Sequence, residues 1–206
     1  MSYTRVKVYN LALSILLLSR EVVDHLTDVT EEVRVLNTHW DIALESTLQD
    51  LDLDSTSEPV TLELIETLPT DHIWAYSYKY PTNCAFLRRL ESCALTDTEI
   101  THIAKRTSIR NGVKVIFTDE VQAVAEIIPK DVPIETLSSM VIMCLANRLA
   151  NLSAPLLVGK GAKTLRKEIK EEYIVTKLEA QETDVRENFN YESDAQNSAW
   201  VRERMS

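Results

Sequence analysis

The fold class depends first on a central stretch, Ile100–Phe117, which reads ITHIAKRTSIRNGVKVIF. Apolar side chains recur on both sides of the pair Asn111 and Gly112. Asn-Gly favours a two-residue type I′ turn, because both turn positions of that type require a positive φ. The stretch therefore predicts an antiparallel hairpin whose first strand reaches Ile109 and whose second begins at Val113.

Outward from the hairpin, short apolar or alternating runs continue over residues 60–128. These runs begin at Val60, Tyr76, Phe86 and Val121. The tyrosines of the second run alternate along the chain, which suits a half-buried strand. We expect about four to six strands in this region, since a period of two is the mark of a strand.

Helical periodicity brackets the β-rich region. Apolar residues at a spacing of three and four predict helices over residues 4–18, 30–51, 134–152 and 160–182. Thr30 has the position of an N-cap, and the two acids after it suit the positive end of a helix. The expected apolar face of the last helix consists of Leu165, Ile169, Tyr173 and Leu178, and Lys177 is assigned to its solvated face.

The sequence thus predicts an α+β fold. Two helix pairs, N-terminal and C-terminal, form a helical bundle with a small antiparallel β-rich insertion, all within residues 1–185. Residues 186–206 are expected to form an extended C-terminal tail, because a segment this polar buries little surface. Its isolated aromatic residues, Phe189, Tyr191 and Trp200, are typical anchors for a partner surface, although a frayed terminus is an equal alternative.

The overall composition narrows the function classes. The 206 residues carry a formal net charge of −10, which disfavours nucleic-acid binding by the whole surface. The 3 cysteines are scattered, so neither a disulfide framework nor a zinc site is indicated, and a reducing cytosol suits them. The apolar run Leu11–Leu18 is short and charged residues follow it, so we expect neither a secretory signal nor a membrane span.

Charge is distributed unevenly along the chain. Between Asp41 and Tyr78 there are nine acids and no Lys or Arg, whereas the region around the hairpin is basic. Identical subunits arranged head to tail could pair these two surfaces in a ring. The residues expected in such inter-subunit pairs are Asp50, Asp52, Asp54, Arg106 and Arg110. The alternative is solvated charge with no partner, since exposed pairs are weak.

The sequence contains no complete catalytic or metal-binding motif. The segment Asp50–Asp54 begins like a calcium loop, but Ser55 and Thr61 stand where Gly and Glu are needed. Gly159–Thr164 reads GKGAKT, which lacks the spacing of a phosphate-binding loop and follows a helix. The 4 histidines share no ligand spacing. We therefore expect no metal, no cofactor and no enzyme, unless an active site is assembled only in space.

Two further stretches carry a family resemblance. Trp74–Arg88 reads WAYSYKYPTNCAFLR, and Leu149–Leu156 reads LANLSAPL before a short Gly-bearing loop and a long charged helix. This layout, over residues 5–182, resembles the head-to-tail adaptors of short-tailed bacteriophages, which include the tail tubular protein A and gatekeeper-type proteins. The match is weaker over residues 92–128.

The resemblance implies a structural virion protein located in the neck and tail and assembled in the host cytoplasm. Twelve copies would form a ring between the portal protein and the tail nozzle or tube. DNA would pass through its lumen without sequence-specific binding. The C-terminal segment would contact the portal or a neighbouring subunit through Phe189, Tyr191, Trp200, Arg202 and Arg204.

Two other classes of function remain open. A small nucleic-acid-associated binding module would use the basic hairpin, with Arg106 and Arg110 in contact with phosphates. An enzyme of unrecognised type would require a pocket with perturbed carboxylates.

Overall fold

The computed structural model describes residues 3–67, 69, 73–92 and 103–203, apart from the side chains of residue 92 and of residues 188–203. The chain divides into two compact units. Met1–Ser55 and Val132–Ser206 form the first, which we call the helical unit, and Thr56–Asp131 form the second, the sheet unit. Helices dominate the first and two antiparallel sheets the second, so the α+β class is confirmed.

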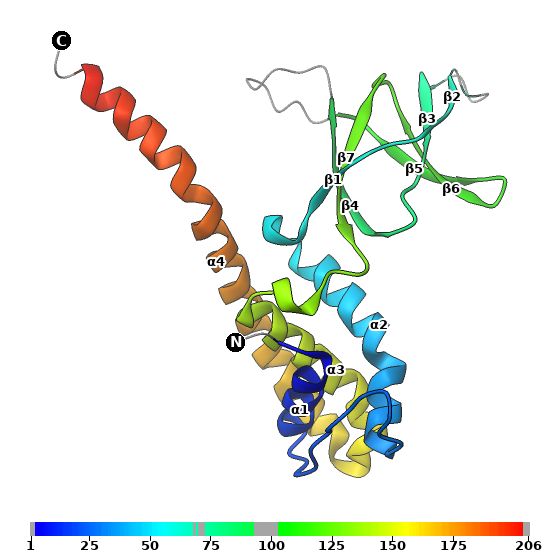
Figure 1. The fold of residues 1–206 in the computed structure, drawn as a ribbon, viewed down its shortest axis with the longest axis vertical. Coiled ribbons are helices and arrows are strands. Elements are labelled where there is room, and N and C mark those ends of the chain that lie inside the picture. Colours follow the sequence, from blue (N-terminus) through cyan, green and yellow to red (C-terminus); the bar gives the residue numbers. More distant parts are fainter. Residues whose placement is uncertain (1–2, 68, 70–72, 93–102, 204–206) are drawn as a thin grey trace. The chain divides into compact units, whose positions relative to one another are not determined.

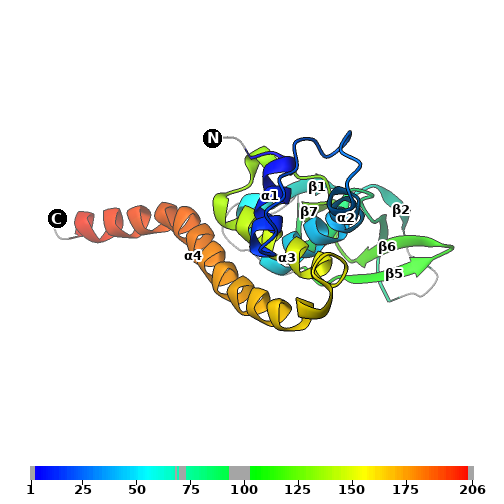
Figure 2. The same cartoon turned by 90° about the horizontal axis from the view of Figure 1, so that it is seen from below.

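Four α-helices are described in the helical unit. They are α1 (Arg5–Ile15), α2 (Glu31–Leu51), α3 (Ser139–Leu157) and α4 (Ala162–Glu203), with short 3-10 turns at Asp54–Thr56 (η1), Ile134–Thr136 (η2) and Gly159–Gly161 (η3). α3 contacts each of the other three helices. Figures 1 and 2 show α3 among them, with α4 starting beside the end of α3 and running back along it.

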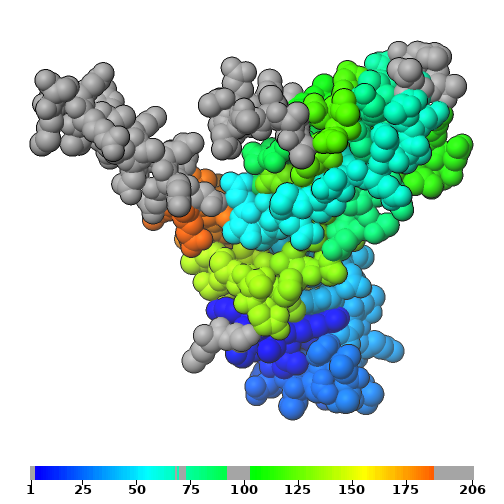
Figure 3. Space-filling view, turned by 45° about the horizontal axis from the view of Figure 1, so that its top comes forward, coloured from blue at the N-terminus to red at the C-terminus, as the bar shows by residue number. Residues whose placement is uncertain are grey.

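α3 is central because it is apolar around most of its circumference, and such a helix is stable only inside a core. Its buried apolar side chains are Val141, Ile142, Cys144, Leu145, Ala146, Leu149, Ala150 and Ala154. In the space-filling view, the beginning of α3 and the segment before it, in yellow-green, lie against α1 in dark blue (Figure 3).

The predicted bounds of this helix, 134–152, are wrong at both ends. A separate 3-10 turn occupies Ile134–Thr136, and α3 begins after Ser138, whose hydroxyl oxygen accepts a hydrogen bond from the Val141 N–H at 3.4 Å. The helix then continues through Pro155 to Leu157. By length and composition alone α3 could cross a membrane, but 61% of its apolar window is buried, as in the core helix of a globular protein.

The last helix is also longer than expected. α4 runs from Ala162 to Glu203, so the predicted end near residue 182 and the extended tail over residues 186–203 are wrong. The physical reason is that no Gly or Pro occurs in this segment to stop the helix. The polar composition of residues 186–203 disfavours burial in a core, but it does not disfavour a helix. Residues 204–206 lie outside the described part of the chain.

The sheet unit contains two antiparallel sheets in its described part. One has the strand order β1-β7-β4 and the other β2-β3-β6-β5. The strands are β1 (Glu58–Thr61), β2 (Leu64–Thr67), β3 (Tyr76–Lys79), β4 (Cys84–Ser92), β5 (Arg106–Arg110), β6 (Val113–Thr118) and β7 (Ala123–Pro129). Their number exceeds the expected four to six because the run that begins at Val60 divides into β1 and β2, which lie in different sheets.

The predicted hairpin is confirmed in its described part. β5 pairs with β6 so that Arg110 stands opposite Val113, and Asn111 and Gly112 have φ values of 51° and 77°. Both turn residues therefore adopt the left-handed backbone that a type I′ turn requires. The expected beginning of the first strand, at Ile100, lies outside the described residues.

The core of the sheet unit forms around one tyrosine of the alternating run. Tyr78 is 2% exposed and packs among Leu90, Ile116 and Ile127. Its hydroxyl group lies 2.7 Å from the carbonyl oxygen of Val121, so burial of the ring leaves its polar end satisfied. This core explains why the tyrosine alternation could be read as a strand.

The turn glycine gives a direct test of the hairpin. We expect Gly112→Ala to destabilise the protein by about 1–2 kcal/mol, because alanine is disfavoured at positive φ. The matched control is Gly161→Ala at the end of η3, directly before α4: Gly161 is not at positive φ, and an added Cβ would meet only ordinary contacts. Urea denaturation of both variants measures the difference, and equal midpoints would contradict the turn assignment.

Candidate assembly surface

One carboxylate joins three helices of the helical unit. Asp50, in the last turn of α2, accepts a hydrogen bond from Arg148 of α3 at 2.5 Å. It also accepts hydrogen bonds from the Tyr173 hydroxyl at 2.6 Å and the Lys177 ammonium group at 2.7 Å, both on α4. Arg148 in turn donates to the Tyr173 hydroxyl. These four residues, the Asp50 cluster, hold α4 against α2 and α3.

The electrostatics of the Asp50 cluster favour its charged form. Burial acts to raise the pKa of Asp50, but the hydrogen bonds from Lys177 and Tyr173 and the nearby charges hold the pKa below its ordinary value. Burial, and then the hydrogen bond to Asp50, raise the pKa of Tyr173. At neutral pH, Tyr173 is therefore a protonated donor and Asp50 an ionised acceptor.

A second set of contacts fixes α4 one to two turns further along. The Gln181 side chain donates to the carbonyl oxygen of Leu51 at 3.0 Å. The carboxylate of Asp184, which is buried, accepts the backbone N–H groups of Asp54 at 2.9 Å and Ser55 at 3.1 Å. Hydrogen bonds to an ionised acceptor are the stronger kind. α4 is thus attached to the end of α2 as well as to α3.

A different face of α4 is apolar and exposed. Ile174, Val175, Leu178 and Val185 are exposed by 57%, 58%, 61% and 53%. At about 3.6 residues per turn, the four side chains lie between roughly 60° and 160° round the helix from Lys177, so they do not share the side of α4 that binds Asp50. Several exposed apolar side chains on one side of a helix are a candidate interaction site, although Gln181 and Glu182 separate Leu178 from Val185 on this side. We call these four residues the outer face of α4.

The predicted apolar face of the last helix is therefore partly wrong. Ile169 and Tyr173 do face the core, but Leu178 lies on the outer face. Lys177, assigned to the solvated face, binds Asp50. The buried face continues instead through Thr176, Ala180 and Asp184, and small or polar residues of this kind carry no hydrophobic period.

A hollow of about 340 Å³ borders the Asp50 cluster. Ile42 of α2 is 61% exposed at this hollow, and Leu152 and Ile169 also line it. Asn147 lines it too, and neither its amide nitrogen nor its amide oxygen has a hydrogen-bond partner among the described residues, although the residue is fully buried. A buried polar group without a partner is unfavourable, so this hollow suits an incoming side chain that can donate or accept.

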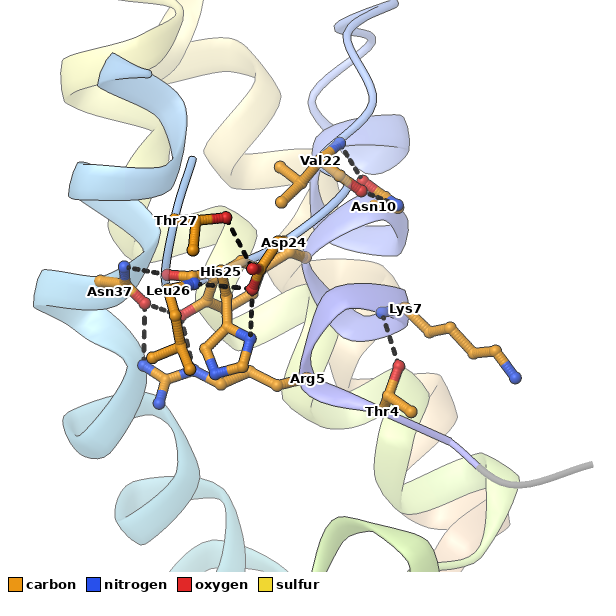
Figure 4. Close-up of polar contacts among 11 residues, drawn as sticks. Thr4, Arg5, Lys7, Asn10, Val22, Asp24, His25, Leu26, Thr27 and Asn37 are labelled. Atoms are coloured by element: carbon orange, nitrogen blue, oxygen red, sulfur yellow. Dashed lines mark hydrogen bonds and ion pairs between the residues drawn. The ribbon is translucent and has the colours of Figure 1, made fainter. Parts of the chain in front are cut away.

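The N-terminal helix is held by a separate polar network (Figure 4). The Tyr9 hydroxyl donates to Asn37 Oδ1 at 2.6 Å, and Arg5 donates to the same oxygen at 3.0 Å. The Asn37 amide nitrogen donates to the carbonyl oxygen of His25 at 3.0 Å. The Tyr9 ring meets Trp40 edge to face, with ring centres 5.4 Å apart. These contacts join α1, α2 and the loop between them, which is a structural role.

The acidic residues expected to pair between subunits lie together at the end of α2. Asp52 is the C-cap of α2, with a φ of 49°, and Asp54 begins η1. Asp50 already has partners within its own chain. Its pairing with another subunit stays a prediction, and it would require exchange of these partners.

The basic residues around the hairpin largely have intramolecular partners as well. Arg110 of β5 forms an ion pair with Glu66 at 2.6 Å, and Arg88 forms one with Glu126 at 2.7 Å. The Lys105 ammonium group donates to the carbonyl oxygen of Arg88 at 2.7 Å, and burial lowers its pKa. Arg106 is exposed on β5. The hairpin therefore offers less free positive charge than its sequence indicates.

The predicted portal-contact residues fall on the last part of the chain. Phe189, Tyr191, Trp200 and Arg202 belong to α4, but their side chains lie outside the described part, and Arg204 lies beyond it. In the residues that the structure describes, no group of three or more His, Cys, Asp or Glu could hold a metal ion. His72, His102 and Cys93 are outside that part.

No protein-family model matches this chain, and no curated protein matches it either. The resemblance to head-to-tail adaptors therefore stays a prediction based on the residues quoted above.

The Asp50 cluster predicts a specific pH dependence. Because the folded-state pKa of Asp50 is lowered, its contribution to stability is present above the ordinary aspartate pKa of about 3.9 and is lost as the pH falls below that value. Asp50→Asn should cost about 1–2 kcal/mol at pH 7, since the cluster is partly exposed, and the difference from wild type should shrink in acid.

The control is Asp41→Asn, an exposed aspartate on the same helix. Urea denaturation at pH 7 and near pH 3 measures all three proteins. An Asp50→Asn variant as stable as Asp41→Asn at pH 7 would contradict the role given to the cluster.

Proposed function

We propose that this protein is a structural subunit of a bacteriophage virion, the head-to-tail adaptor whose copies form a ring between the portal protein and the tail nozzle or tube. Twelve copies would continue the DNA channel, as the family resemblance implies. The subunit is assembled in the host cytoplasm, has no membrane partner and has a structural rather than a catalytic role.

The observation that carries this proposal is the outer face of α4. Ile174, Leu178 and Val185 are each more than half exposed on a helix whose other side is hydrogen-bonded to Asp50 and to the backbone of Asp54. Fully burying a side chain of this size contributes about 1.5–3 kcal/mol, so covering the half that is exposed here contributes roughly 1–1.5 kcal/mol for each side chain and favours association. A subunit that must pack against identical copies has a use for such a face.

The length of α4 supports the same conclusion. At about 1.5 Å per residue, its 42 residues span roughly 63 Å, against roughly 28 Å for the 19 residues of α3. α3 therefore cannot cover α4 along its whole length. In the proposed ring, the four helices form a bundle that serves as the wall, and the remainder of α4 reaches the portal or a neighbouring subunit.

The hollow beside the Asp50 cluster and the charge of the chain also fit a ring. The unpartnered amide of Asn147 would receive a polar side chain from a neighbouring copy. A net charge of −10 would let DNA pass through the lumen without tight binding. The alternative of a binding module that uses the basic hairpin has less support, because Arg110 already has an intramolecular partner.

Electron microscopy of the protein mixed with its portal protein tests the proposal. We expect rings seated on the portal, with a central channel wide enough for duplex DNA. A stable monomer that ignores the portal would contradict the adaptor function.

The same experiment with Leu178→Glu tests the assembly surface. A charge in the outer face should abolish rings while leaving the monomer folded, because the side chain is solvent-exposed in the single chain. Val23→Glu, at an apolar side chain that is 85% exposed on a loop, is the matched control and should assemble normally. Rings of unchanged yield with Leu178→Glu would exclude the outer face as the interface.

A further inference from the structure

A basic hollow lies where α4 begins. Its volume is about 490 Å³, and five cationic side chains line it, with no carboxylate among the described residues of its lining. These cations are Lys160, Lys163, Arg166, Lys167 and Lys170. The chain as a whole has a net charge of −10, whereas the lining of this hollow is positively charged.

The position of these cations is unfavourable for the helix that carries them. The N-terminal end of a helix has a partial positive charge, so acids stabilise it and bases do not. The first turn of α4 contains no acid, and Lys163, Arg166 and Lys167 occupy its first two turns. The electrostatics of the helix end therefore do not account for these cations, whereas a bound anion would interact favourably with both the cations and the helix end.

The charges in this hollow are also less neutralised than those of the hairpin. Within the described residues, Lys160, Lys163 and Lys170 form no ion pair. Lys167 lies 3.8 Å from Glu171, but both side chains are largely exposed, so the pair is weak. Arg166 is positioned by Asn151, whose side-chain oxygen accepts its Nε–H at 3.2 Å. The hollow thus presents free ammonium groups around one fixed guanidinium.

We propose that this hollow binds the phosphate backbone of double-stranded DNA without reading its sequence. Lys163 and Lys170 lie seven residues apart, which is about 10 Å along the helix, and a DNA strand carries roughly one phosphate per 3.4 Å of its axis. The row therefore spans more than one phosphate. Lysine ammonium groups are flexible point charges, suited to phosphate contacts that position a duplex and carry no sequence information.

The segment that lines the start of this hollow is the one that resembles a phosphate-binding loop. Gly159–Thr164 lacks the spacing of a nucleotide site, and it follows a helix rather than a strand. In the proposed contact, its lysines would instead bind phosphate through their positive charge at the start of a helix. The inference goes beyond the adaptor function and depends only on the residues of the hollow.

Fluorescence anisotropy with a labelled duplex of mixed sequence, over a series of salt concentrations, tests the inference on the full-length protein. We expect salt-sensitive binding to wild type. In the double variant Lys163→Gln/Lys167→Gln, the slope of log K against log salt should become less steep by about 2, since each lost phosphate contact removes about 0.9. Urea denaturation should show that the variant is no less stable than wild type.

The matched control is Arg106→Gln/Lys130→Gln, which removes the same charge from exposed positions in the sheet unit and should bind like wild type. Absence of wild-type binding at low salt, or equal losses in both double variants, would overturn the proposal. A third result would also overturn it: wild type binds no DNA but self-associates, and the Lys163→Gln/Lys167→Gln variant does not self-associate. An acidic segment of a second copy, and not DNA, would then occupy the hollow. Normal rings together with lost DNA binding would support the proposal independently of the adaptor function.

Discussion

The position of α4 in the helical unit depends on the ionised carboxylate of Asp50. A partly buried charge is tolerated only where partners compensate for lost hydration, and here one partner comes from α3 and two come from α4. Because these hydrogen-bond donors are on different helices, their binding to the one carboxylate fixes the positions of α3 and α4 relative to α2. Gln181 and Asp184 extend the attachment along α4. The direction in which the outer face of α4 points follows from these contacts.

Much of the fold could be predicted from local chemistry. Asn111 and Gly112 determine their own turn, because few other residues accept positive φ, and the hairpin was predicted correctly. The existence of the four helices followed from apolar periodicity. The ends of the helices were harder to predict. The start of α3 depends on the cap at Ser138, and α4 continues past residue 182 because no Gly or Pro ends it. The polar composition of residues 186–203 does not exclude a helix, so the predicted extended tail is wrong.

The candidate site was harder to predict, because it depends on contacts between distant segments. Asp50 and Lys177 are 127 positions apart, and nothing local shows that they meet. The apolar character of Leu178 predicts burial, whereas the buried side of α4 runs through Thr176 and Ala180, which lie on the opposite side of the helix. The sequence indicates free basic charge at the hairpin, but Arg110 forms an ion pair there, whereas Lys163 lies in a hollow with four other cations. Counting charges along a sequence cannot show which ones are neutralised.

We propose that copies of the subunit meet at the outer face of α4. Hydrogen–deuterium exchange, compared between the free chain and the assembled particle, tests it most directly. We expect exchange to slow on assembly in the peptides that contain Ile174, Leu178 and Val185. Additional protection confined to Thr56–Asp131, with α4 unchanged, would contradict it.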